Sequence, residues 1–144
     1  METTLQKISR VTGRKPVECK CVKCKMQCKT PCLGTPEDIL NLINAGFKDQ
    51  LSITYWCVGM MSGHMDRPVK MVQAIQLVTG CIFFENGLCK LHDAGLKPTE
   101  GKLSHHSIKA ENFEYKKSLS ANVAKEWTNI KNKTLVEEIF SLFR

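Results

Sequence analysis

The sequence predicts an α+β fold: a small, irregular, cysteine-rich domain with short strands, a hairpin and a C-terminal helix. Three observations favour this class. Five of the eight cysteines fall within residues 19–32, β-branched residues and turn signals fill the middle of the chain, and apolar residues recur at helical spacing near its end. A chain of 144 residues can bury roughly 68–70% of its unfolded surface, so a genuine core is expected.

The chain divides into three predicted segments. Residues 1–18 form a basic lead-in, residues 19–106 a cysteine-rich domain, and residues 107–144 a helical segment that packs on it. The lead-in has no apolar run of signal-peptide length, and no run of eighteen apolar residues occurs anywhere, so we expect a cytoplasmic protein. In a reducing cytosol, clustered cysteines are more often metal ligands or catalytic groups than disulfides.

The clearest helix signal is TPEDILNLINAGF, directly after the cysteine cluster. Thr35 can cap this helix, Pro36 suits its first position, and Gly46 suits its exit. Because the helix starts three residues after Cys32, we expect it to support the cluster. Its predicted buried face consists of Ile39, Leu40, Leu42 and Ile43.

The middle of the chain predicts short strands with turns at SGHMD and ENG. The ENG turn, at residues 85–87, is a strong signal for a two-residue hairpin. In the register of such a hairpin Phe84 faces Cys89, and Cys81 faces His92. The last pair would then lie close enough to share a metal ion.

From about Ser107 the chain is predicted to be helical. Charges of both signs lie between the apolar positions, which favours packing on the core over a membrane or partner helix. The predicted core positions are Leu119, Val123, Trp127, Ile130, Ile139 and Phe143.

The cysteine spacing indicates a metal site. Zinc takes four ligands in a tetrahedron, and cysteines two to four residues apart bind it through one tight turn, so Cys21 and Cys24 are the best pair. Iron or an iron–sulfur cluster would use the same thiolates. Isolated Cys57 is equally well explained as a small buried residue. We therefore predict a fold stabilised by metal, zinc first and iron or an iron–sulfur cluster as the alternative. The candidate ligands are Cys19, Cys21, Cys24, Cys28, Cys32, Cys81, Cys89 and His92.

Two stretches, CVKCKMQCKTPCLGTPEDILNLI and CIFFENGLCKLHDAGLKPTEGK, resemble the YkgJ-type zinc- or iron-chelating domain family. The resemblance covers roughly residues 19–106. That family has a C-x-x-C-x-x-C-C cluster, a T-P-E-D helix start, C-P-x-x-x-x-G-x-C-x-I-Y, and R-P-x-x-C-R. Cys21 and Cys24 match its opening pair, while Cys28 and Cys32 stand where the later cysteines would be, at wider spacing.

The second stretch departs from the family pattern. Cys81 and Cys89 match its cysteines, but His92 replaces the tyrosine, Lys97 the arginine and Gly101 the last cysteine. One ligand is therefore left open, and zinc tolerates exchange between thiolate and imidazole. The candidate substitutes are His92, His105, His106 and Cys57.

The resemblance implies metal binding without a defined activity. Neither of two nucleotide-binding patterns, G-x-G-x-x-G and G-x-x-x-x-G-K-[ST], occurs in the chain. We therefore predict a small metal-binding protein rather than an enzyme, with a mainly structural site that combines cysteines of both stretches.

Two alternatives remain from the sequence. The net charge of +7, with eight Lys or Arg residues and one acidic residue between Lys7 and Lys29, is compatible with a nucleic-acid-binding zinc module. A metal-dependent or iron–sulfur redox enzyme would need a general base near an open metal position. The candidate bases are His64, Asp66, His105 and His106.

Overall fold

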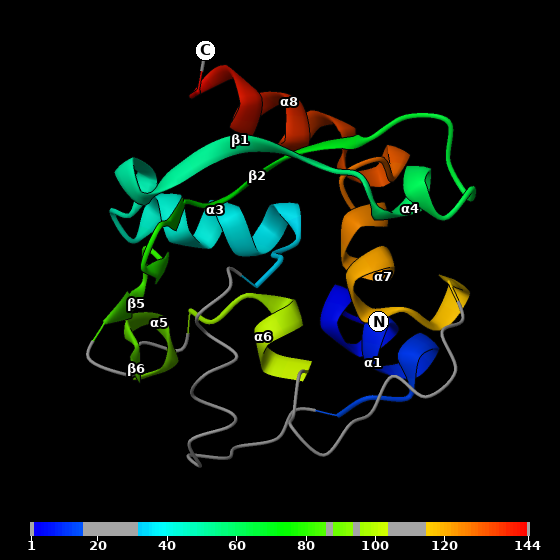
Figure 1. Ribbon diagram of the computed structural model, residues 1–144, viewed down its shortest axis with the longest axis horizontal. Helices are drawn as coiled ribbons and strands as arrows, with labels where there is room; N and C mark the ends of the chain where they lie inside the picture. The colour runs from blue at the N-terminus through cyan, green and yellow to red at the C-terminus, as the bar shows by residue number, and fades with distance from the viewer. Residues whose placement is uncertain (1, 16–31, 86–87, 94–95, 104–114, 144) are drawn as a thin grey trace.

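The computed structural model describes residues 2–15, 32–85, 88–93, 96–103 and 115–143, with the side chains at 85, 88, 89, 92 and 93 left out. Its helices and strands confirm the mixed α+β class, whereas stabilisation by metal stays a prediction. In chain order (Figure 1) they are α1 Thr4–Thr12, α3 Pro36–Asn44, η2 Lys48–Gln50, β1 Leu51–Trp56, α4 Val58–Met61, β2 Val69–Ala74, β3 Gln76–Leu77, β4 Gly80–Cys81, β5 Phe84–Glu85, β6 Leu88–Cys89, α5 Lys90–Asp93, α6 Thr99–Leu103, η3 Tyr115–Lys117, α7 Leu119–Lys125, η4 Ile130–Asn132 and α8 Lys133–Ser141.

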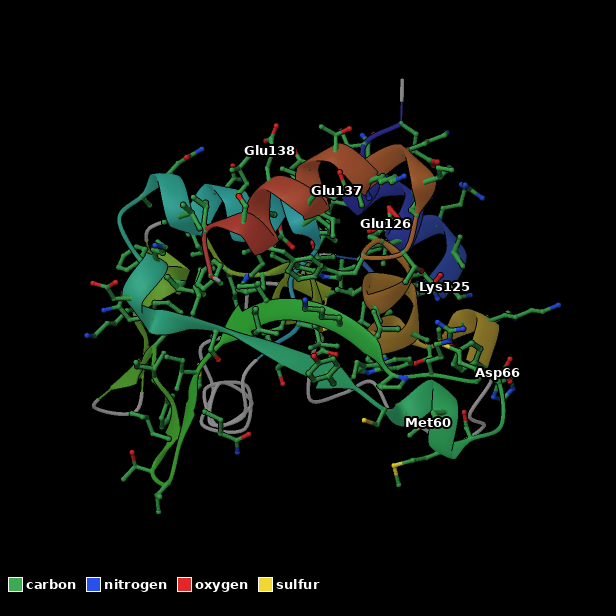
Figure 2. The ribbon with its side chains drawn as sticks, turned by 90° about the horizontal axis from the view of Figure 1, so that it is seen from above. Met60, Asp66, Lys125, Glu126, Glu137 and Glu138 are labelled. Atoms are coloured by element: carbon green, nitrogen blue, oxygen red, sulfur yellow. The ribbon has the colours of Figure 1, made fainter. Side chains whose placement is uncertain are left out.

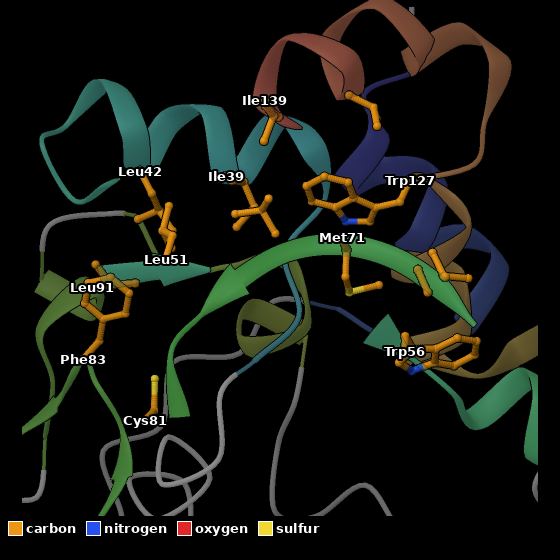
Figure 3. Packing of buried hydrophobic residues seen from close by; sticks show 14 of the residues in the cluster. Ile39, Leu42, Leu51, Trp56, Met71, Cys81, Phe83, Leu91, Trp127 and Ile139 are labelled. Carbon is orange, nitrogen blue, oxygen red and sulfur yellow. The ribbon is translucent and has the colours of Figure 1, made fainter. Parts of the chain in front are cut away.

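The strands β1 and β2 form an antiparallel ribbon at the centre of the fold, with Leu51 opposite Ala74 and Trp56 opposite Val69. Helices α3 and α8 contact each other and lie together on one side of this ribbon (Figure 3). The main core fills the space between the ribbon and these two helices. Its fully buried members include Ile39, Leu42, Met71, Val72 and Ile139.

The predicted helix after the cysteine cluster is confirmed as α3. The Thr35 hydroxyl accepts a hydrogen bond from the Asp38 N–H, and the Asp38 carboxylate accepts one from the Thr35 N–H, so the two form a capping box. Pro36 occupies the first turn, and Gly46 leaves the helix with a φ of 94°. Of the predicted face, Ile39 and Leu42 are fully buried, and Leu40 and Ile43 are half-buried.

The predicted hairpin is confirmed in register but is shorter than expected. Strands β5 and β6 pair Phe84 with Cys89, and residues 86–87 between them lie outside the description. The pairing of Cys81 with His92 is wrong. Cys81 belongs to β4, where it faces Gln76, and His92 belongs to helix α5. The chain changes strand partners after β4, so the ladder ends before it reaches His92.

The C-terminal segment is helical but interrupted. Helices α7 and α8 are separated by a turn and by η4, because Asn129 caps η4 with its side chain and breaks the periodicity. The prediction that Ile130 lies in the core is wrong, since it is 83% exposed. No helix in the described ranges is both long and apolar enough for a membrane span. Four of the predicted core positions are buried as expected, and Phe143 is half-buried: Leu119, Val123, Trp127 and Ile139.

The basic lead-in contains a helix that the sequence analysis missed. Helix α1 starts with a capping box between Thr3 and Gln6 and ends at Gly13, whose φ is 73°. Ile8 on its inner face is 1% exposed. Figure 2 shows α1, in blue, alongside α7, in orange-brown, and the two helices are in contact. Part of the lead-in therefore belongs to the folded core.

Candidate metal centre

The predicted ligands are only partly within the described residues. Among the side chains that are described, no group of three or more His, Cys, Asp or Glu could hold a metal ion. Cys32 and Cys81, at the border of the predicted centre, are the predicted ligands whose side chains the structure describes. Cys19, Cys21, Cys24 and Cys28 lie outside the description, and Cys89 and His92 are described as backbone alone.

Cys81 lies inside the fold. Its residue is 8% exposed and belongs to the main core cluster together with Phe83 and Leu91 (Figure 3). Its strand β4 pairs with β3, so the backbone on either side of the thiol is held by the sheet. A ligand at this position would anchor a metal ion directly to the core.

Cys32 marks the end of the predicted cluster, and its side chain is partly exposed. Its sulfur lies beside Gly101 in α6: a Cβ atom placed on Gly101 would be 3.2 Å from Cys32 Sγ. The same point is 2.8 Å from Cε of Lys97, whose flexible side chain lies over the glycine. Helix α6 therefore brings the KPTEGK motif against the end of the cysteine cluster.

The backbone that follows Cys32 is fixed by two buried side chains. Gln73 Oε1 accepts a hydrogen bond from the Gly34 N–H at 2.8 Å, and Gln73 Nε2 donates one to the Gly34 carbonyl at 2.9 Å. Trp127 Nε1 donates to the same carbonyl at 2.8 Å. Gln73 is 3% exposed and Trp127 4%, so these bonds are shielded from water. The backbone next to Cys32 is thus fixed by hydrogen bonds to Gln73 of β2 and to Trp127 of the C-terminal segment.

The start of α3 is also the anchor for α6. Asp38 Oδ2 accepts hydrogen bonds from the Thr99 N–H at 2.8 Å and from the Thr99 hydroxyl at 2.6 Å, in addition to its capping bond with Thr35. A carboxylate bonded to several donors makes shorter and stronger hydrogen bonds than a neutral acceptor. One carboxylate therefore joins the TPED and KPTEGK motifs.

Glu100 makes the second link between these motifs. Its carboxylate accepts a hydrogen bond from the Leu33 N–H at 3.1 Å, while its own N–H donates to the Leu33 carbonyl at 3.1 Å. Burial raises the pKa of the Glu100 carboxyl, against the lowering effects of the Leu33 N–H and of the nearby Arg14 guanidinium. Residues 33–35, directly after Cys32, are consequently held by hydrogen bonds to β2, to α6, to Asp38 of α3 and to Trp127.

Three further candidate groups, Cys57, His64 and Asp66, lie around α4, which follows the Trp56 end of the ribbon in the chain. Cys57 precedes α4 and is partly exposed. His64 Nδ1 is 2.9 Å from Ser62 Oγ, and its ring stacks on Tyr115 with 4.2 Å between the centroids. These contacts explain His64 as a packed loop residue. Asp66 is exposed, and His105 and His106 lie outside the description.

Comparison with known proteins adds no assignment. No protein-family model matches the chain, and neither a curated protein nor a solved structure matches it. The resemblance to the YkgJ-type family therefore rests on the residues alone and stays a prediction.

Sequence reasoning missed the residues that support this border. Gln73 belongs to no motif, Trp127 was predicted as a core residue but not as a hydrogen-bond donor, and Asp38 and Thr99 were noted only as parts of TPED and KPTEGK. Chemically, the border holds the backbone next to one thiol, that of Cys32, in a defined place.

Proposed function

We propose that this chain is a small metal-binding protein whose cysteines hold zinc, with iron or an iron–sulfur cluster as the alternative metal. The observation that carries the proposal is the frame around Cys32. Five thiols in fourteen residues lead into a backbone segment that Gln73, Trp127 and Glu100 hold in place. Oriented ligands of this kind are what metal sites require from their surroundings.

The donor set fits zinc. Thiolate sulfur is a preferred ligand of Zn²⁺ and of iron–sulfur clusters, and the spacing of Cys21 and Cys24 suits one tight turn. When bound, such an ion would supply folding free energy, about 10–16 kcal/mol in zinc-finger peptides, which is as large as the whole stability of a typical domain, about 5–15 kcal/mol. We therefore propose a mainly structural role.

The nucleic-acid alternative gains no support from the described contacts. Lys7 pairs with Glu126 at 2.9 Å, and Arg10 pairs with Glu2 at 2.9 Å, so two cations of the basic lead-in are already engaged within the chain. We do not propose it further.

The test is elemental analysis with an absorption spectrum on protein purified without oxygen. We expect about one to two zinc ions per chain and no visible colour. Iron with inorganic sulfide and a brown colour would assign a cluster instead, and protein without either metal would contradict the proposal.

Variants localise the site. We expect Cys32→Ser and Cys89→Ser each to lower the metal content and the melting temperature, because each removes a ligand and the site is predicted to combine both stretches. Cys57→Ser is the comparison variant: because Cys57 lies by α4 we expect it to retain both, and a loss of metal would identify Cys57 as the ligand that the sequence leaves open. Undiminished metal in Cys89→Ser would exclude a shared site.

A further inference from the structure

The short helix η4 and helix α8 form an open apolar groove with the turn that precedes them. Its volume is about 290 Å³, and its apolar walls are Trp127, Ile130, Val136 and Phe140. Figure 1 shows α8 at an outer edge of the molecule. Pockets for small molecules usually have volumes of about 300–1,000 Å³, so this groove lies at their lower limit and suits a single apolar side chain of another chain.

Ile130 is an exposed apolar residue in this groove. It lines the groove and is nevertheless 83% exposed, so most of its side chain projects into water. Asn129 holds it there, because the Asn129 side chain accepts a hydrogen bond from the Lys131 N–H at 3.0 Å and caps η4. Removing apolar surface from water is favourable by about 25 cal/mol per Å². The same surface therefore offers an apolar groove and an apolar side chain that could fill such a groove.

Two charges of opposite sign line the same groove. Lys133 and Glu137 lie about one turn apart on α8, and both are exposed. Neither forms an ion pair with any residue that the structure describes. A lysine that precedes a glutamate by four residues is also the less favourable order for pairing within a helix. Both charges are therefore available to a partner.

A second copy of α8 that runs antiparallel to the first complements these features. In the register that places Lys133 against Glu137 of the second copy, Ile130 lies against Phe140 of the second copy, because both pairs are symmetric about residue 135. A twofold interface repeats every contact, so each pair forms twice. One arrangement thus joins opposite charges and covers the exposed isoleucine.

We propose that the groove of η4 and α8 docks a second copy of this chain. In the resulting twofold dimer, Ile130 of each copy fills the groove of the other, and Lys133 of each copy pairs with Glu137 of the other. The dimer does not depend on the proposed metal binding. An interface built on two short helices is smaller than the standard of about 800 Å² per partner, so the dimer is weak and forms at high concentration.

The first test is sedimentation velocity of the full chain, purified with its metal and kept reduced with a phosphine so that no disulfide links two copies. Between about 1 µM and about 1 mM we expect the monomer to convert to a dimer. A chain that stays monomeric over this range would overturn the second copy as the occupant and leave the groove to a different protein.

A matched pair of variants locates the interface. We expect Ile130→Lys to weaken dimerisation at least tenfold, because it brings a charge into the apolar groove. Val78→Lys makes the same change at a fully exposed position between β3 and β4, outside the groove, and should leave dimerisation unaltered. A dimer that Ile130→Lys does not weaken, or that both variants weaken equally, would overturn the proposal.

Exchanging the charges tests the antiparallel register. Lys133→Glu and Glu137→Lys each bring like charges together twice in their own dimers, so at about 50 mM salt we expect each to weaken dimerisation at least fivefold. An equimolar mixture of the two variants should recover dimerisation, since opposite charges face each other again at both sites. A mixture that associates no better than either variant alone would overturn the proposed dimer.

Discussion

At the scale of single residues, Gly34 carries an unusual share of the structure. Both of its backbone polar groups are bonded to buried side chains, the N–H to Gln73 and the carbonyl to Gln73 and Trp127. A buried polar group that loses its partner costs about 1–3 kcal/mol, more than a typical hydrogen bond contributes. The Gly34 N–H therefore depends on the Gln73 side chain, while the Gly34 carbonyl is shared between Gln73 and Trp127.

Gln73→Leu tests this dependence. We expect it to lower the free energy of unfolding by about 2 kcal/mol, because the Gly34 N–H loses its partner in a buried site. Urea denaturation measures the change. Gln76→Leu, at an exposed position of β3, is the control and should change stability by less than about 0.5 kcal/mol. Equal effects of the two variants would contradict the role assigned to Gln73.

Glu100 makes stability depend on pH. Its folded-state pKa is raised by burial, so the folded chain binds more protons than the unfolded chain between the two values, and stability falls as pH rises through that window. At pH values above the folded-state pKa of Glu100, this contribution to stability is fully lost. At pH values below 4.5, the ordinary pKa of a glutamate, the Glu100 carboxyl is protonated in the folded and the unfolded chain, and burying it no longer lowers stability.

We expect Glu100→Gln to unfold at a higher urea concentration than the unaltered protein at pH 7, because glutamine keeps an acceptor for the Leu33 N–H without a buried charge. The difference should shrink as the pH approaches 4.5, with both proteins at equal metal content. Glu137→Gln, on the exposed face of α8, serves as control. A Glu100→Gln protein that is less stable at pH 7 would show that the carboxylate bonds outweigh desolvation.

Contacts between single residues could be predicted from the sequence where the two residues lie close together in the chain. The Thr35–Asp38 cap and the pairing of Phe84 with Cys89 both rest on spacings of a few residues. The Gln73–Gly34 and Thr99–Asp38 bonds join residues 39 and 61 positions apart, and no local pattern indicates such partners.

At the scale of elements, α1 shows how a local signal can be overlooked. The Thr3–Gln6 capping box and Gly13 were visible in the sequence, but the density of lysine and arginine suggested a solvated segment. What the sequence could not indicate was the docking partner. Lys7 reaches Glu126, at the end of α7, although 119 positions separate the two residues.

Lys7→Met tests the docking of α1. Glu126 is 4% exposed, so removing its cation leaves a carboxylate with less compensation for lost water, and we expect a destabilisation of about 1 kcal/mol. Thermal and urea unfolding measure it. Arg10→Met is the control, because the Arg10–Glu2 pair is exposed and such pairs contribute little. A larger loss in the control would contradict the assignment.

In the C-terminal segment the sequence pattern was recognised, but the break between its helices was not predicted. Apolar residues at helical spacing predicted one continuous packing face, and four of the positions are buried. The break at Asn129 moves Ile130 into solvent, because a side chain that bonds its own backbone competes with the helix. Periodicity thus located the core better than it located the helix ends.

At the scale of the whole molecule, the three segments predicted from the sequence contribute to one shared hydrophobic cluster. Ile8 from the lead-in, Leu103 from the cysteine-rich segment, and Leu119 and Val123 from the C-terminal segment share a buried cluster. The fold class followed from the sequence because it depends on local periodicity. The arrangement of the segments did not, since it depends on contacts between residues about a hundred positions apart.

The bonds from residues 33 and 38 to residues 100 and 99 also bear on the folding rate. They close a loop of the chain that contains the whole β1–β2 ribbon, at separations of 67 and 61 residues. Closing such a loop costs entropy before the contacts form, and contacts of this range slow folding. Gly101 comes to lie beside Cys32 only after that closure. The end of the cysteine cluster therefore takes its native surroundings only when two segments more than sixty residues apart have met.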